Sequence, residues 1–293
     1  MKVGYFGLAD NREAKAGNLN HALAQTSSPW VVTFDADMIP THNFLMETVP
    51  YTFLSRMKQL EDGSWAERTE EEMDESYKIG FIQTPQSFYN ADLFQYNFFS
   101  EQRVPNEQDF FFREINVGRN NANAPIYAGS NTLISRAALE EVGGISTGTI
   151  TEDFETGIRI QSKSYTCYAI DKTLAHGLAP TTVDSLIKQR VRWGRGCINS
   201  LRRTHIILNP HLKLNTKISY LTCKMYWWTF FRRFVFILSP IIFALFGIPV
   251  VICNLKELLF IWLPSYVLYN QGLKVTSGGI RNKRWSNTID TVI

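Results

Sequence analysis

Residues Trp30 to Asp37 read WVVTFDAD, and this stretch decides the fold. The apolar segment WVVTF predicts a buried strand that ends at two carboxylates, Asp35 and Asp37. In open α/β sheets, ligands bind at the carboxyl ends of the strands. There, one carboxylate can hold a ribose hydroxyl while the other binds a hard cation that bridges phosphate oxygens. A D-x-D pair is common by chance, so its place after a strand is what makes it a candidate site.

Outward from this strand, the hydrophobic pattern predicts strands that alternate with helices. Strands are expected at Val3–Leu8, Trp30–Phe34, Ile79–Gln83, Ala128–Ser135 and Tyr165–Ile170. Helices are expected at Ala14–Gln25, from Pro40 through about Met57, and at Arg136–Val142, Glu152–Gln161 and Thr182–Arg203. The charged stretch Leu60–Tyr77 predicts a solvent-exposed loop or helix. This alternation predicts an α/β sandwich with a largely parallel sheet.

Composition excludes several classes of protein. With 293 residues, 45% of them hydrophobic and 19% charged, the chain is neither disordered nor collagen-like. Its four cysteines are widely spaced without a C-x-x-C pair, which argues against a disulfide framework or a zinc site. Residues 1–171 carry 13 Lys+Arg and 24 Asp+Glu, whereas residues 172–293 carry 17 and 3. The basic, aromatic-rich second part indicates a nucleic acid or a membrane surface as partner.

Two uncharged stretches favour the membrane. Phe234–Cys253 has twenty residues without a charge, enough for a helix to cross a hydrocarbon core of about 30 Å. A buried hairpin in a soluble protein is the alternative. Leu258–Leu273 is uncharged but shorter and contains Pro264, so it predicts either a return span or a re-entrant segment. Basic residues flank both stretches: Arg232, Arg233, Lys274, Arg281, Lys283 and Arg284. By the positive-inside rule, we expect a multi-pass protein of the cell membrane with both flanks in the cytoplasm.

Two further motifs carry side chains suited to chemistry. Thr151-Glu152-Asp153 opens a predicted helix, where it is either a capping segment or a carboxylate held as a general base for a hydroxyl. Gln189 to Trp193 reads QRVRW: Arg192 offers a planar fork for a diphosphate, and Trp193 offers a flat face for a sugar ring. No nucleic-acid motif accompanies this basic helix, and the membrane span accounts for its charge. Nucleic acid is therefore not expected as a partner.

The order of the motifs is more specific than any one of them. The chain carries, in sequence, KAGNLN at 15–20, DAD at 35–37, QTPQ at 83–86, AGSN at 128–131, TED at 151–153, GLAP at 177–180 and QRVRW at 189–193. Over about residues 5–293, this order resembles the family 2 glycosyltransferases, specifically the catalytic subunits of bacterial cellulose synthases and their relatives. Hyaluronan-type synthases share Q-x-x-R-W but usually differ at T-E-D.

The resemblance implies a role for each matching residue. It places Lys15 near the uridine of a UDP-sugar donor, Asp35 on the ribose, and Asp37 on a divalent metal, Mg²⁺ or Mn²⁺. Gln189 and Arg192 would bind the diphosphate. The donor it implies is UDP-glucose.

The same resemblance implies the acceptor side of the site. Asp153 would be the catalytic base, and four residues would bind the end of a growing polysaccharide: Gly129, Ser130, Glu152 and Trp193. Ala128 stands where the family usually has Cys. Membrane lipid and other synthase-complex subunits are the further partners it implies.

The resemblance also implies the architecture. We expect an α/β, GT-A-like domain over 1–203 that lacks the family's first strand and its uracil-binding aspartate, which Asp10 does not replace. Interfacial helices at 204–233, a transmembrane helical hairpin at 234–273 and a cytosolic tail at 274–293 would follow. Together with the absence of the family's later membrane spans and of any nucleotide-regulated β-barrel domain, these absences predict a chain truncated at both ends. The expected activity is processive, inverting transfer onto a β-linked glycan. Two alternatives stay open: a non-catalytic fragment or part of a split synthase, and a non-processive transferase acting on a lipid or short glycan.

Overall fold

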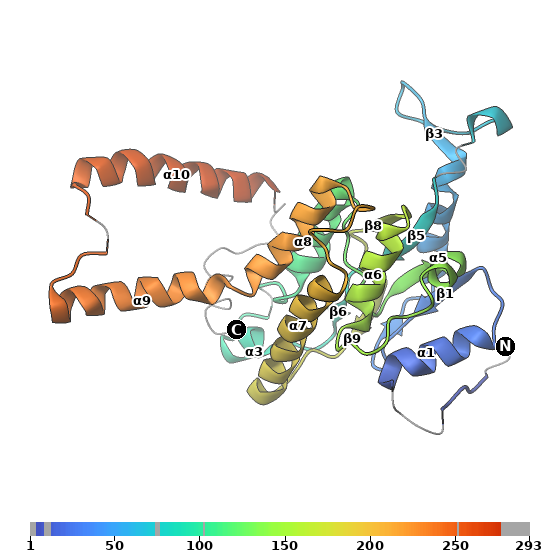
Figure 1. The fold of residues 1–293 in the computed structure, drawn as a ribbon, viewed down its shortest axis with the longest axis horizontal. Helices are drawn as coiled ribbons and strands as arrows, with labels where there is room; N and C mark the ends of the chain where they lie inside the picture. Colours follow the sequence, from blue (N-terminus) through green and yellow to red (C-terminus); the bar gives the residue numbers. More distant parts are fainter. Residues whose placement is uncertain (1–3, 9–12, 74–76, 102, 251, 277–293) are drawn as a thin grey trace.

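A four-stranded sheet forms the centre of the computed structural model, which describes residues 4–8, 13–73, 77–101, 103–250 and 252–276 (Figure 1). Its order is β1 (Trp30–Thr33), β7 (Thr132–Ser135), β5 (Ile79–Gln83) and β8 (Thr166–Ala169). Strands β5 and β8 are parallel, but β7 is antiparallel to both of its neighbours. The expected largely parallel sheet is therefore wrong for β7. The chain reaches β7 through loop 127–131, at the end of the sheet where β1 and β5 finish.

Apolar side chains cover both faces of this sheet. On one face, α1 (Ala14–Ala24), α5 (Arg136–Glu141) and α6 (Glu152–Ser162) pack in a cluster that includes Phe81 and Ile134. The other face carries Ile82 and Leu133 beneath α2 (Phe44–Thr48) and the 3₁₀-helix Val49–Arg56. Neighbouring strand residues thus point to opposite faces, as expected for a strand that is buried on both sides.

The predicted elements mostly lie within a few residues of the observed ones, with two exceptions. Residues 4–8 have no regular secondary structure, so the strand expected at the N-terminus is not observed there, and Val3 lies outside the described residues. The helix expected from Pro40 begins instead at Phe44. Ile39–Pro40 forms β2 and pairs with β9 (Ala175–Gly177) in a sheet ordered β2, β9 and β6 (Ser87–Phe88). This pairing keeps Pro40 extended.

The charged insert forms an arm that projects from the body (Figure 1). Strands β3 (Met57–Gln59) and β4 (Trp65–Glu67) pair antiparallel, and the 3₁₀-turn Glu70–Glu72 follows. Lys58 Nζ lies 2.5 Å from Glu72, and Arg68 Nε donates to Met57 O at 2.9 Å. The segment is solvent-exposed as predicted, but its β-hairpin was not predicted. Residues 74–76 of the predicted insert lie outside the described residues.

Along the chain, a series of short helices follows β6 and leads to β7. They are α3 (Leu93–Asn97), the π-helix Phe111–Ile115, α4 (Asn116–Gly118) and the 3₁₀-helix Arg119–Ala122. After β9, the long helix α7 (Val183–Arg203) packs on α6, and α8 (Leu214–Tyr226) packs on α7. The buried Tyr220 of α8 donates to Gln161 Oε1 of α6 at 2.6 Å. Helix α8 is thereby attached to the body beside α6.

Two helices extend away from this body (Figure 1). Among the described residues, α9 (Thr229–Phe246) is the one helix long and apolar enough to cross a membrane. It ends at Gly247, which has φ +65°, so the uncharged run Phe234–Cys253 is not one continuous helix as expected. Pro249 follows two residues later, and this Gly-then-Pro pattern ends helices. Helix α10 (Leu255–Thr276) then returns toward the body, and it contains the predicted second stretch.

Candidate active site

Lys15 joins three segments at the carboxyl end of the central sheet. Its ammonium group, carried by α1, forms an ion pair with Asp35, which follows β1. Lys15 Nζ also donates to the Gly129 carbonyl at 2.8 Å. The Asp35 amide in turn donates to Ser130 Oγ at 2.9 Å. These contacts hold the first carboxylate of DAD, the KAGN lysine and loop 127–131 in one arrangement.

Gly129 lets this loop pass directly against Asp153, the last residue of TED. Its backbone has φ +77°, a conformation that favours glycine. A Cβ atom at this position would lie 2.6 Å from Asp153 Oδ2 and 3.3 Å from Cβ and Cγ of the same side chain. The contact brings the Asp153 carboxylate to the cluster around Lys15 and Asp35.

The surroundings of Asp153 change its acidity. Burial raises the pKa of Asp153 to about 7, and the neighbouring Glu152 charge and, less strongly, Asp35 act in the same direction. The Phe154 amide, which donates to Asp153 Oδ1 at 2.7 Å, and the Lys15 charge oppose the rise. A carboxylate with a pKa near neutrality is suited to accept a proton from a hydroxyl group.

A buried glutamine holds the loop that approaches Asp153. Gln83, 1% exposed at the end of β5, donates from Nε2 to Ser130 O at 2.8 Å. Its Oε1 accepts from the Ala128 amide at 2.8 Å and from Thr132 Oγ1 at 2.7 Å. Gln86 Nε2 donates to Ala128 O at 3.0 Å. Sequence reasoning recorded QTPQ without a role, although polar residues at the end of an apolar strand were the available signal.

A second buried contact joins loop 127–131 to the end of β1. Tyr127 is 1% exposed, and its hydroxyl lies 3.2 Å from Thr33 Oγ1 at the end of β1. Burial raises the pKa of Tyr127, so this phenol stays protonated and can serve as a hydrogen-bond donor. The contact ties β1 to the residue that precedes Ala128 and Gly129.

Close packing joins TED to α7. A Cβ atom on Gly196 would lie 2.3 Å from Thr151 Cγ2, so no side chain fits between the two segments. Ser200 Oγ lies 3.2 Å from the hydroxyl groups of Thr149 and Thr151. Glycine inside a helix costs about 1 kcal/mol relative to alanine, and this close approach explains why it is present. Sequence reasoning missed Gly196, whose position inside a helical pattern was the available signal.

A buried carboxylate makes a second connection between α6 and α7. Glu155 is fully buried, and it pairs with Arg159 Nη2 at 2.6 Å and with Arg203 Nε at 2.9 Å. Because a buried charge requires such partners, this cluster fixes α6 against the C-terminal end of α7. Nothing in the sequence pattern distinguished Glu155 from the other acidic residues of the helix.

Three predicted residues lie on α7 rather than on the segments that form this cluster. Gln189, Arg192 and Trp193 belong to the N-terminal half of α7; Arg192 is exposed and Trp193 half-buried. Across the described ranges, neither Arg192 nor Trp193 makes a hydrogen bond or ion pair with Lys15, Asp35 or Asp153. Gln189 Oε1 is buried and has no hydrogen-bond partner among the described side chains and backbone groups.

Asp37 is exposed and carries the carboxylate predicted to bind a metal. Its Oδ2 accepts from the Leu178 amide of GLAP at 3.3 Å. In the part of the chain that the structure describes, no three His, Cys, Asp or Glu side chains gather as a metal site. Mg²⁺ commonly needs one or two protein carboxylates, with substrate phosphates and water as its other ligands. The single exposed carboxylate of Asp37 fits that type of site.

A family model described as glycosyl transferase family group 2 matches residues 30–270. The chain belongs to this family. Among relatives of this family 2 glycosyltransferase, cellulose synthase 2 of Novacetimonas hansenii is 32% identical over 292 residues, which is 99% of this chain and 17% of that protein. The UDP-forming cellulose synthase 1 catalytic subunit of Komagataeibacter xylinus is 31% identical over 289 residues, 99% of this chain and 36% of that protein. The chain thus spans about a third or less of these relatives.

A solved structure supports the fold of this family 2 glycosyltransferase. The mannosyltransferase PcManGT from Pyrobaculum calidifontis, in complex with GDP-Man and Mn²⁺, superposes with a TM-score of 0.54. The two are 15% identical, and the match covers 96% of this chain and 65% of the mannosyltransferase. The expected α/β, GT-A-like fold is confirmed, with a sheet that is mixed rather than largely parallel.

Proposed function

We propose that this family 2 glycosyltransferase transfers a sugar, with inversion, from a UDP-sugar to the end of a membrane-associated β-linked glycan. The observation that carries the proposal is the approach of Asp153 to Gly129, Lys15 and Asp35, with the pKa of Asp153 near 7. A general base for a hydroxyl needs such a pKa and a place beside the bound donor.

On the donor side, Asp35 would hold the ribose hydroxyls next to the uridine, with its ion pair to Lys15 orienting the carboxylate. Asp37 would hold a divalent cation, Mg²⁺ or Mn²⁺, which when bound neutralises charge on the diphosphate. Gln189 and the exposed Arg192 would bind the diphosphate from α7. Arginine is suited to this because its planar fork can donate two hydrogen bonds to a phosphate.

On the acceptor side, Gly129, Ser130, Glu152 and Trp193 would position the terminal sugar. Asp153 accepts the proton of its hydroxyl group as the hydroxyl oxygen attacks the anomeric carbon of the donor. The bond between that carbon and the diphosphate oxygen breaks, and UDP leaves with the electron pair. Attack opposite the leaving group inverts the anomeric configuration, so an α-linked donor gives a β-linked product.

The proposal extends to the membrane and to the nature of the polymer. We propose that α9 and α10 form a membrane hairpin, that residues 1–203 face the cytoplasm as the catalytic domain, and that transfer is processive. The names of relatives from Komagataeibacter xylinus and Pseudomonas fluorescens include UDP-forming, which supports UDP as the released nucleotide and UDP-glucose as the first donor to test. Other synthase subunits would then be partners.

The test is a donor panel. The full chain in membranes is incubated with labelled UDP-glucose, UDP-galactose, UDP-N-acetylglucosamine and GDP-mannose. The products are digested with linkage-specific glycosidases and separated by length. We expect label from a UDP-sugar in long chains that β-specific enzymes degrade. Label confined to single additions would contradict processivity, and absence of incorporation from every donor would contradict the proposed transferase activity.

A further inference from the structure

A largely buried ion pair lies next to the predicted acceptor residue Trp193. Arg190 of α7 pairs with Glu107, which lies in the segment between α3 and the π-helix. The side chains are 12% and 10% exposed. Removing both charges from water is costly, and such pairs often contribute little net stability. A role in positioning therefore explains this pair better than stability does.

Arg190 also contacts Trp193 directly. Its guanidinium carbon lies 4.6 Å from the centre of the Trp193 ring, within the range of a cation–π interaction. The two residues are three apart on α7, so their side chains share one face of the helix. The guanidinium is thus held by Glu107 and by the indole ring.

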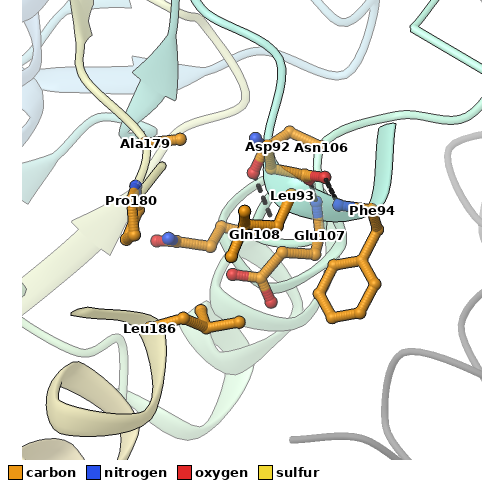
Figure 2. Close-up of a pocket in the computed structure, with 9 residues that line it drawn as sticks. All are labelled: Asp92, Leu93, Phe94, Asn106, Glu107, Gln108, Ala179, Pro180 and Leu186. Carbon is orange, nitrogen blue, oxygen red and sulfur yellow. Dashed lines mark hydrogen bonds between the residues drawn. The ribbon is translucent and has the colours of Figure 1, made fainter. Parts of the chain in front are cut away.

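Glu107 is itself firmly held (Figure 2). Its amide donates to Asp92 Oδ2 at 2.9 Å, and Asp92 Oδ1 accepts from the amides of Phe94 and Gln95 at the start of α3. Asp92 is 5% exposed. Glu107 and Leu186, one turn before Arg190 on α7, line the same small cavity. The carboxylate that meets Arg190 therefore projects from a rigid support.

We propose that Glu107 is a positioning residue: acting through Arg190, it fixes the Trp193 ring as a preformed platform for the acceptor sugar. This rests on the proposed function, in which Trp193 stacks on that sugar. Glu107 lies outside every motif that carries the family resemblance. An aromatic side chain fixed before binding loses less conformational entropy when the sugar arrives.

The first test separates acceptor binding from donor binding. In the full chain in membranes, Glu107→Gln keeps the size of the side chain but removes its charge. We expect the KM for a soluble oligosaccharide of the product's linkage to rise about tenfold, while kcat and the Kd for UDP stay within about twofold. The matched control is Asp184→Asn, which removes the carboxylate of an exposed ion pair with Lys188 on the same helix. It should change none of these values.

Arg190→Lys is the second variant. It keeps a positive charge beside Glu107 but removes the planar group from the indole face, so acceptor KM should rise as in Glu107→Gln. A double-mutant cycle then tests whether Glu107 acts on acceptor binding through Trp193. In a Trp193→Ala background, Glu107→Gln should not weaken acceptor binding further. Additive losses, or a parallel loss of UDP affinity, would overturn the proposal.

A measurement without turnover keeps this proposal separate from the proposed function. The chain is labelled with fluorotryptophan, and the ¹⁹F resonance of Trp193 is assigned by its absence in Trp193→Phe. We expect that resonance to shift or broaden in Glu107→Gln and Arg190→Lys but not in Asp184→Asn. An unchanged resonance in the first two would overturn the positioning role. A shifted resonance in a chain that transfers no sugar would overturn the proposed function instead.

Discussion

Gly129→Ala tests the contact on which the candidate active site depends. The added Cβ would stand 2.6 Å from Asp153 Oδ2, whereas ordinary contacts begin at about 3.4 Å. The Asp153 carboxylate must therefore move by about 0.8 Å, or the loop must move away from it. Rotation of the carboxylate group would itself displace Oδ2, and Cβ and Cγ of Asp153 would still lie at 3.3 Å, slightly inside ordinary contact distance.

The expected magnitude has two parts. Alanine at φ +77° costs about 1–2 kcal/mol of folding free energy. Misplacing a catalytic group by about 1 Å can cost about 100-fold in rate, or about 2.7 kcal/mol of transition-state stabilisation. We therefore expect kcat/KM for sugar transfer to fall about 100-fold while the Kd for UDP stays within about threefold.

The matched control is Gly143→Ala. Gly143 has φ +82°, and a Cβ atom there would meet nothing within 4 Å, so it reports backbone strain without a clash. Gly129→Ala should lose at least as much unfolding free energy as the control in denaturant titrations, because it adds a clash to the same backbone strain, but only the control should keep its transfer rate. Near-normal transfer by a folded Gly129→Ala variant would refute the placement of Asp153 against this loop.

Three further predictions follow from the same geometry. Transfer should rise with pH through about 7, because Asp153 must be ionised to accept a proton. Glu152→Gln removes a charge that raises the pKa of Asp153, so the rise should move to lower pH when each profile is normalised to its own plateau. A rise at unchanged pH would count against this coupling. Gly196→Ala places a Cβ atom 2.3 Å from Thr151 Cγ2, and it should reduce the initial rate of transfer by about tenfold or more. In the control Gly118→Ala, the added Cβ atom meets nothing within 4 Å, and the initial rate should be unchanged. Asp37→Ala should abolish both transfer and its stimulation by Mg²⁺ or Mn²⁺ in a metal titration; persistent metal-stimulated transfer would contradict the metal role.

Local patterns predicted most elements of the catalytic domain. The apolar runs at Trp30 and Ile79 became β1 and β5, and helix periodicity placed α1 and α5–α7 within one or two residues. The end of α9 at Gly247 was missed, although glycine followed by proline is a signal that ends helices. The antiparallel direction of β7 could not be predicted locally, because it depends on where loop 127–131 crosses the sheet.

Contacts between distant segments account for the rest of the site. Motif order named Lys15, Asp35 and Asp153 as a set, but not the Gly129 contact that brings Asp153 to the others. The support from Gln83 and the Gly196–Thr151 approach join residues 45 or more apart in sequence. Such pairs leave no periodic signal along the chain, so a single sequence does not reveal them.

Asp153→Asn tests the central claim most directly. The variant keeps the shape of the side chain but accepts no proton, so we expect sugar transfer to be abolished while UDP binding, measured by calorimetry, is retained. Because the pKa of Asp153 is higher in the folded than in the unfolded chain, ionisation of this carboxyl group lowers the free energy of unfolding. The loss is absent at pH values below the pKa of the unfolded chain, grows as pH rises toward 7, and is complete above it. The variant should therefore unfold at no lower temperature than the wild type at pH 8. Wild-type turnover by Asp153→Asn would contradict the account.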